Sequence, residues 1–493
     1  MPADEGWLGL DLGTQSARAV VVSSDGRVLA AAAEPIVSHR DGARHEQDPR
    51  DWWDALARAC RKTMSQVAPG SVRGAALCAT SGSILLVDER GEALTPGVMY
   101  DDTRAVAEAD RVNQAGGDRW AALGYSRMQP SWALPKLLHL LHQDGDGNSH
   151  GRLAHQADFI TRRLVGRPVP SDSSHALKTG YDAIDEEWPL EVLDRLGIAP
   201  GVLPEVVRSG RQLGTLCRHA AEATGIPVGT SLYAGMTDGC AAQLAAGALA
   251  PGSWNSVLGT TLVVKGVSRE LLRDPAGVVY SHRSPDDGWL PGGASSAGAG
   301  VLAAHFDGRD LAALDRAAGA REPASVVAYP LVSRGERFPF MAPDAEGFVL
   351  GSPTDEVDHY AALLQGVAYV ERLIFDYLDF LGAPVDGPLT LTGGAARSRY
   401  WSQLRADILD RSVRIPANAE AALGMAVLAA ASATGHSLAD TAAGMVRVAD
   451  ELAPRDERTS RFREPYVRLV DELQARGWLD AAVANHTRRR AVQ

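Results

Sequence analysis

The sequence is poor in cysteine and has no long apolar run. Its four cysteines, Cys60, Cys78, Cys217 and Cys240, stand far apart and form no C-x-x-C pair, which argues against a zinc site and a disulfide framework. No stretch reaches the roughly 18 apolar residues that span a bilayer. The N-terminus has no basic region ahead of an apolar run. We therefore expect a cytoplasmic protein that does not associate with membranes.

Basic residues are also fewer than acidic ones. The 493 residues include 49 basic and 61 acidic ones, a formal net charge of -12, which disfavours nucleic acid as a partner. The basic cluster Arg488–Arg490 at the C-terminal end is expected to be solvated. With 45% hydrophobic and 22% charged residues the composition is that of a globular protein. The length predicts two to four domains.

Hydrophobic patterning predicts two halves that are built alike. In the first half, short strands joined by hairpin signals precede a helix with apolar residues at helical spacing. In the second half, a strand, a Gly-Thr-Thr turn and another strand precede a long helix. The predicted strands are 7–12, 17–22, 27–33, 75–79, 231–234, 254–258, 262–267, 389–392 and 413–415. The predicted helices run from 49, 240, 360 and 420, and a further one passes through 401–408.

This repeat predicts an α/β fold of two ribonuclease H-like domains flanking a cleft, where ligands of such pairs bind. We place an N-terminal domain at 1–248, a C-terminal domain at 249–445 and a helical tail at 446–493. Residues 101–230 are expected to add mainly helical and irregular insertions.

Several catalytic signatures are absent. The chain has no G-x-x-x-x-G-K-[ST] loop, no H-E-x-x-H and no G-x-S-x-G. The glycines Gly292, Gly293, Gly298 and Gly300 do not follow the dinucleotide-binding pattern. These absences exclude P-loop, zinc-protease and serine-hydrolase chemistry.

Two glycine-containing hairpins could hold phosphate. Asp11 ends a strand, and the turn through Gly13, Thr14 and Ser16 offers backbone N–H groups and hydroxyls to phosphate oxygens, with a carboxylate beside them for hydrated Mg²⁺. The alternative is an ordinary polar β-turn. The turn recurs in Gly259-Thr260-Thr261, and this repetition favours phosphate binding.

Asp238 begins a predicted helix after a strand, within Gly235-Met236-Thr237-Asp238-Gly239. It could simply cap the helix, because Asp is common at that position. It could equally accept the proton of a hydroxyl that attacks a γ-phosphate. The motif by itself leaves both interpretations open. Arg334, Glu336 and Arg337 are expected to form a solvated or interdomain charge cluster.

Taken together and in this order, DLGTQS, GMTDG, LGTTL and TGGAARS resemble the FGGY carbohydrate kinases over roughly residues 7–435. Further segments, among them 171–181 and 331–339, look most like the D-ribulose kinases of cyanobacteria and plant plastids. The resemblance implies ATP-dependent phosphorylation of a sugar, D-ribulose to D-ribulose 5-phosphate, by a monomer or homodimer that uses ATP and Mg²⁺. Xylulokinase or another pentulose or polyol kinase is the alternative, and an actin-like ATPase or a sugar sensor without kinase activity is a more remote one.

The resemblance also implies roles for individual residues. Asp238 would be the general base, and Asp11 with Asp238 would hold the metal. The sugar would contact Asp11, Ser81, Asp101 and Asp238. The nucleotide would contact Gly13, Thr14, Gln15, Ser16, Gly259, Thr260, Thr261, Gly393, Gly394, Ala395, Ser398 and Asn418. Where relatives commonly have three glycines and a closing Asn, this chain has Gly393-Gly394-Ala395 and Ser398.

Overall fold

The computed structural model describes residues 5–125, 127–143 and 151–492. These residues form two compact units, and each unit is discontinuous in sequence. Unit 1 comprises Met1–Gly247, His282–Trp289 and Asn418–Arg447, and unit 2 comprises Ala248–Ser281, Leu290–Ala417 and Val448–Gln493. In the part of the chain just given, no helix combines the length and apolar character needed to cross a membrane.

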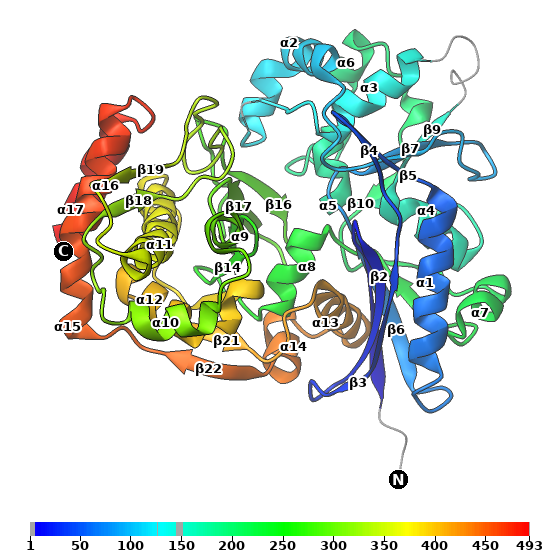
Figure 1. The fold of residues 1–493 in the computed structure, drawn as a ribbon. Coiled ribbons are helices and arrows are strands. Elements are labelled where there is room, and N and C mark those ends of the chain that lie inside the picture. Colours follow the sequence, from blue (N-terminus) through cyan, green and yellow to red (C-terminus); the bar gives the residue numbers. More distant parts are fainter. Residues whose placement is uncertain (1–4, 126, 144–150, 493) are drawn as a thin grey trace. The chain divides into compact units, whose positions relative to one another are not determined.

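Unit 1 is built on a six-stranded sheet (Figure 1). The predicted meander is confirmed: the first strand pairs antiparallel with the second, and the second with the third. The first strand also runs parallel to the strand at 72–79, which in turn runs parallel to the strand at 231–233. In spatial order the strands are β12 (Gln212–Thr215), β13 (Ser231–Tyr233), β6 (Val72–Ala79), β1 (Gly6–Leu12), β2 (Ser16–Ser23) and β3 (Val28–Pro35).

Helices cover both faces of this sheet, as Figure 1 shows for α1 (Pro49–Met64) and α13 (Ala421–Thr434). Helix α1 begins after Asp48, whose carboxylate accepts from the N–H of Arg50, and it buries Trp52, Leu56 and Cys60. On the same face lie α4 (Gln156–Val165) and α7 (Arg218–Thr224); α8 (Asp238–Ala245) lies with α13.

Helix α13 packs directly on β1 at Gly9. A Cβ atom at Gly9 would lie 1.6 Å from the carbonyl oxygen of Ala422, so only glycine permits this approach. This packing places residues 418–447 in unit 1, whereas residues 448–492 pack on unit 2. The grouping therefore differs from the sequential division at 248 and 445, since the contacts of α13 are made with the first sheet.

The remaining elements of unit 1 include the insertions expected between residues 101 and 230. A second sheet has the order β4 (His39–Asp41), β5 (Arg44–Gln47), β8 (Gly97–Val98), β7 (Ile84–Val87) and β9 (Arg152–His155). The others are α2 (Val106–Ala122), α3 (Ala133–Gln143), β10 (Ser171–Asp172), α5 (Ser173–Ala176), η1 (Leu177–Thr179), α6 (Leu190–Arg195), η2 (Pro200–Val202), β11 (Val206–Val207) and α14 (Leu438–Met445).

Unit 2 repeats the sheet of unit 1, which confirms the predicted duplication. Its order β22-β21-β20-β14-β15-β17 has the same succession of parallel and antiparallel pairs as β12-β13-β6-β1-β2-β3, and β16 lies beyond β17. The strands are β14 (Trp254–Leu258), β15 (Leu262–Gly266), β16 (Tyr280–Arg283), β17 (Trp289–Ser295), β20 (Leu389–Thr392), β21 (Val413–Pro416) and β22 (Val448–Leu452).

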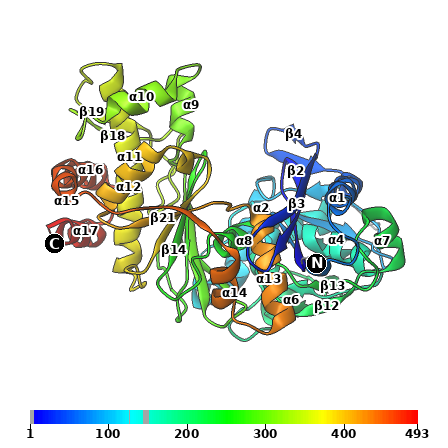
Figure 2. The same ribbon diagram turned by 90° about the horizontal axis from the view of Figure 1, so that it is seen from below.

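The helices of unit 2 are organised around α11 (Glu356–Phe380), which is largely buried. Figure 2 shows α12 (Arg399–Leu409) beside it, and α16 (Arg463–Ala475) and α17 (Ala481–Val492) lying side by side. Inside this layer Arg405 and Glu371, at most 1% exposed, form an ion pair. The other elements are α9 (Gly300–Phe306), α10 (Leu311–Ala318), β18 (Val327–Tyr329), β19 (Phe348–Leu350), η3 (Gly394–Arg397), α15 (Asp456–Thr459) and η4 (Ser460–Phe462).

Candidate active site

Three parallel strands of unit 1 end at one edge of the sheet and bring together residues that are far apart in sequence. Asp11 lies near the end of β1, Ser81 follows β6, and Asp238 follows β13. Parallel strands present their carboxyl ends at the same edge, the usual location of ligand sites in such sheets. An isolated parallel bridge joins Ala79, the last residue of β6, to Thr237, which follows β13.

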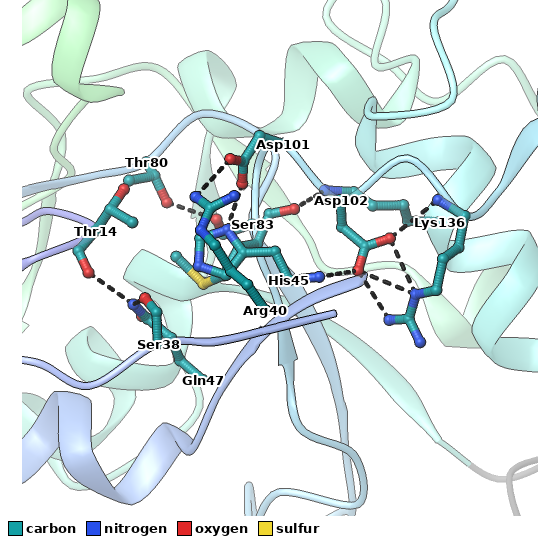
Figure 3. Close-up of polar contacts among 12 residues, drawn as sticks. Thr14, Ser38, Arg40, His45, Gln47, Thr80, Ser83, Asp101, Asp102 and Lys136 are labelled. Carbon is teal, nitrogen blue, oxygen red and sulfur yellow. Dashed lines mark hydrogen bonds and ion pairs between the residues drawn. The ribbon is translucent and has the colours of Figure 1, made fainter. Parts of the chain in front are cut away.

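The first hairpin has the form expected for a phosphate turn. The N–H of Gly13 donates to the carbonyl of Ser16 at 3.0 Å, which closes the turn. The amide of Gln47 donates to the carbonyl of Thr14 at 2.7 Å, as Figure 3 shows. Gln15 is exposed, while Gly13, Thr14 and Ser16 are half-buried. The backbone of the turn is therefore held by Gln47 and by its own hydrogen bond, while its side chains remain at least partly exposed to solvent.

Asp11 is only 3% exposed. Arg18, its partner across the strand pair, donates to Oδ2 at 3.2 Å, and the thiol of Cys78 donates to Oδ1 at 3.4 Å. Burial raises the pKa of Asp11 to about 6, and the negative charge of Asp238 also raises it, whereas Arg18 lowers it. The two carboxylates are thus close enough to repel each other, a situation that a cation would relieve.

Asp238 is the first residue of α8 and not its cap. Thr237 occupies the N-cap position, so the simple capping interpretation is wrong for Asp238. Its Oδ1 accepts from the N–H of Gly239 at 2.7 Å, and the side chain is partly exposed. A carboxylate in the first turn of a helix is stabilised by the helix dipole. The carboxylate of Asp238 is therefore held in place at a partly exposed position.

The turn that contains Ser81 is held by a lysine. Lys178 Nζ donates to the carbonyl of Ser81 at 3.2 Å. The hydroxyl of Ser81 itself is buried and has no hydrogen-bond partner among the described residues. Buried polar groups are nearly always paired, and an unpaired one calls for an explanation. A ligand hydroxyl at this edge would provide the missing partner.

Asp101 has two polar side-chain contacts, shown in Figure 3. Arg40 donates to its Oδ2 at 2.7 Å, and the ring of His45 contacts its Oδ1. Burial opposes ionisation of Asp101, but the hydrogen bonds from His45 and Arg40 outweigh it, so the pKa of Asp101 is lowered. Asp101 is therefore a fixed carboxylate, and a sugar would share its oxygens with these partners.

Sequence reasoning missed several residues around this edge. Lys136 is buried and donates from Nζ to the carbonyl of Met99 at 2.7 Å, and burial lowers the pKa of Lys136 to about 7. Lys136 could have been recognised from the sequence, because it is a lone charged residue within the apolar run Ala133–Leu141. Tyr100 forms a hydrogen bond with Thr14; burial, Asp101 and Asp238 raise the pKa of Tyr100. No local sequence pattern identifies Tyr100 as a residue of the site.

In unit 2 the corresponding hairpin joins β14 to β15. The N–H of Gly259 donates to the carbonyl of Thr261 at 3.1 Å, and the N–H groups of Ala299 and Gly300 donate to the carbonyls of Gly259 and Thr260. The hairpin is therefore anchored through its backbone. Thr260 is exposed, which leaves its hydroxyl accessible to a phosphate.

The glycine turn after β20 has one strictly required glycine. Gly393 has φ 86°, and a Cβ atom there would lie 2.5 Å from the carbonyl oxygen of Leu258. Gly394 is exposed with open space around it, and Ala395 is half-buried. Ser398 caps α12 by accepting from Trp401 at 3.0 Å and donates to Asp315 at 2.7 Å. These two bonds leave one acceptor lone pair of the hydroxyl, so Ser398 stays among the nucleotide contacts proposed below.

Asn418 lies in unit 1, in the turn before α13. Its side-chain oxygen accepts from the N–H of Glu420 at 2.9 Å. Glu336, expected in a solvated or interdomain cluster, is instead 2% exposed and accepts from Ser295, Ser296 and Tyr329. It anchors its loop, while Arg334 is exposed.

No group of three or more His, Cys, Asp or Glu side chains suited to a metal ion occurs within residues 5–125, 127–143 and 151–492. A cation at Asp11 and Asp238 would thus take most of its ligands from water and phosphate. Mg²⁺ commonly binds in that way, through one or two carboxylates. The carboxylates of Asp11 and Asp238 suit such an ion, because a cation would offset the repulsion between their negative charges.

Comparison with known proteins gives consistent matches over the whole chain. Models of the FGGY family of carbohydrate kinases match residues 6–245 (N-terminal domain) and 254–433 (C-terminal domain). The chain is 32% identical to the xylulose kinase of Streptomyces rubiginosus and 33% identical to that of Streptomyces coelicolor, in each case over 93% of this chain and 95% of the relative. The crystal structure of xylulose kinase from Rhodospirillum rubrum superposes with a TM-score of 0.85 at 25% identity, covering 96% of this chain and 99% of that one.

Proposed function

This chain belongs to the FGGY family of carbohydrate kinases, and we propose that it transfers the γ-phosphoryl group of ATP to a hydroxyl of a pentulose, with D-xylulose as the favoured acceptor. The observation that carries the proposal is that Asp11, near the end of β1, and Asp238, after β13, both lie at the carboxyl edge of the first sheet. The relatives described above are named xylulose kinases. They support D-xylulose, the alternative from the sequence, better than D-ribulose.

In this proposal Asp238 accepts the proton of the attacking sugar hydroxyl. Phosphoryl transfer needs mainly positioning and charge stabilisation, and one well-placed base completes the requirement. The unpaired hydroxyl of Ser81 supports a sugar contact at that turn. Asp101, fixed by Arg40 and His45, supplies an acceptor for a second sugar hydroxyl.

Asp11 and Asp238 are the residues that would hold Mg²⁺, which when bound would neutralise charge on the phosphates. In unit 1 we assign Gly13, Thr14, Gln15 and Ser16 to the phosphates, because the turn presents N–H groups and hydroxyls. In unit 2 we assign the nucleotide to Gly259, Thr260, Thr261, Gly393, Gly394 and Ala395. Ser398 and Asn418 are kept as further nucleotide contacts.

A substrate panel tests the proposal directly. ATP is incubated with D-xylulose, D-ribulose, hexuloses and polyols, and release of ADP is followed together with the phosphorylated sugar. We expect ADP release to depend on sugar and kcat/KM to be highest for D-xylulose. Turnover of ATP that no sugar stimulates would overturn the kinase assignment. A clear preference for D-ribulose would keep the kinase but overturn the choice of acceptor.

The raised pKa of Asp11 predicts how the rate depends on pH. Since the pKa is about 6 and the ionised form holds the metal, the rate at subsaturating Mg²⁺ should fall as pH decreases through about 6. A cation favours the carboxylate, so more Mg²⁺ should move this limb to lower pH. Initial rates over pH 5 to 8 at two Mg²⁺ concentrations measure the effect.

The variant Asp11→Asn should phosphorylate sugar more slowly than the wild-type protein. The fall of its rate at low pH should no longer shift with the Mg²⁺ concentration. Asp25→Asn is the matched control, because Asp25 is an exposed carboxylate at the β2–β3 turn of the same sheet. Two results would contradict the metal role of Asp11. One is a fall in rate at low pH that does not depend on the Mg²⁺ concentration, and the other is the same fall and the same Mg²⁺ dependence in Asp11→Asn.

A further inference from the structure

Residues 171–179, which comprise β10, α5 and η1, form a segment rich in buried polar side chains. Ser171, Asp172, Ser174, His175 and Thr179 are each 5% exposed or less. Burying so many polar groups costs free energy unless each is hydrogen-bonded. The bonds that they make therefore determine the geometry around them.

Within the segment the bonds centre on His175. Asp172 accepts from the N–H of His175 at 2.8 Å, and its other oxygen contacts Nδ1 of the ring at 2.7 Å. Burial lowers the pKa of His175, but the charge of Asp172 and its hydrogen bond outweigh this effect, so the pKa is raised above its ordinary value. His155 Nε2 bonds to Thr179 at 2.9 Å. The segment is thus held by the Asp172–His175 pair within it and by His155 of β9 outside it.

One end of the segment reaches the turn that carries the general base. Ser174 Oγ accepts from the N–H of Thr237 at 3.1 Å and lies 3.1 Å from Thr237 Oγ1. Thr237 is the N-cap of α8, directly before Asp238. Ser174 therefore fixes the backbone from which the Asp238 side chain projects.

The same segment reaches the turn assigned to the sugar. His175 Nε2 lies 3.3 Å from the carbonyl of Ala79, and Lys178 Nζ donates to the carbonyl of Ser81 at 3.2 Å. The Lys178 stem also packs against Gly82, where its Cδ would lie 3.2 Å from an added Cβ. The backbone of the 79–82 turn is therefore held by two residues of the segment.

We propose that residues 171–179 hold the base and the sugar turn in a fixed relation, with Ser174 as a positioning residue for Asp238 and Lys178 as a positioning residue for Ser81. The inference rests on the proposed kinase function and deepens it. It assigns separable effects to two neighbouring residues: Ser174 acts on the chemical step, and Lys178 acts on sugar binding. A segment with a purely structural role would not divide its effects in this way.

The test uses Ser174→Ala and Lys178→Met in the full chain, with Ser173→Ala as the matched control. Ser173 is the adjacent buried serine on α5, and its hydroxyl contacts neither turn in the bonds described above. Steady-state kinetics with the best sugar of the panel gives kcat and KM, calorimetry gives the sugar Kd, and thermal unfolding reports on the fold.

We expect Ser174→Ala to lower kcat about 10-fold with the sugar KM and Kd unchanged, because small displacements of a catalytic group are costly. Lys178→Met should raise the sugar KM and Kd about 5- to 10-fold with kcat nearly unchanged, since the part-buried carbonyl of Ser81 loses its donor. Ser173→Ala should match the wild-type protein. Equal changes in kcat and KM in both variants, or variants no different from Ser173→Ala, would overturn the inference. A wild-type protein that phosphorylates no sugar would instead refute the proposed function.

Discussion

Asp238→Asn is expected to lower kcat for sugar phosphorylation by about 10²-fold or more while the protein stays folded. The amide has nearly the shape of the carboxylate and can still accept from the N–H of Gly239. It cannot, however, take the proton of the attacking hydroxyl. Steady-state rates at saturating ATP and sugar measure the loss, and thermal unfolding reports on the fold.

A suitable control for this variant is Asp440→Asn. Asp440 lies in the first turn of α14, which has eight residues like α8, and it is exposed in the same unit. It therefore matches the loss of a charge at a helix N-terminus without touching the proposed site. Comparable rates in Asp238→Asn and Asp440→Asn would refute the role of Asp238 as the base.

Arg405→Met is expected to destabilise unit 2 by about 3 to 5 kcal/mol, because it leaves Glu371 charged and buried without its partner. Arg405 Nε and Nη2 donate to the two oxygens of Glu371 at 2.7 and 2.8 Å, and Nη2 also lies 2.8 Å from Ser256 Oγ. The guanidinium therefore links α12 to α11 and to β14. Urea unfolding, with the midpoint and slope fitted separately, gives the free energy of unfolding.

The control is Arg399→Met on the same helix. Arg399 pairs with Asp450 at 3.0 Å, but its side chain is 71% exposed, so we expect a loss below about 1 kcal/mol. Removing both charges in Arg405→Met with Glu371→Met should recover much of the lost stability, because a buried pair can be replaced by apolar groups at little cost. Equal effects of Arg405→Met and Arg399→Met would contradict the importance of the buried pair.

Local patterns in the sequence determined the strands, the helices and the repeat of the sheet. Alternation, turn residues and helical spacing act between neighbours in the chain, so the strands at 7–12, 254–258 and 389–392 were predicted close to their observed bounds. The predicted repeat of the sheet was confirmed by the same strand order and pairing over six strands in each unit. For the same reason the turns with Gly13 and Gly259 could be identified as hairpins.

Only the tertiary structure decided which elements and side chains meet. The apolar pattern of 420–433 predicts a buried helix but does not identify its partner, and the packing of Ala422 on Gly9 placed that helix with the first sheet. Periodicity shows that a face is buried, not what covers it.

The same limit applies to the site. Asp101 could be named from the sequence, but Arg40 and His45 reach it from residues 61 and 56 positions away. Asp11 and Asp238 lie at the same edge of the sheet because β1, β6 and β13 run parallel and end there, and strand order is set by long-range pairing. The sequence by itself therefore determined the types of residue available for catalysis, whereas the fold decided their distances, their charges and their neighbours.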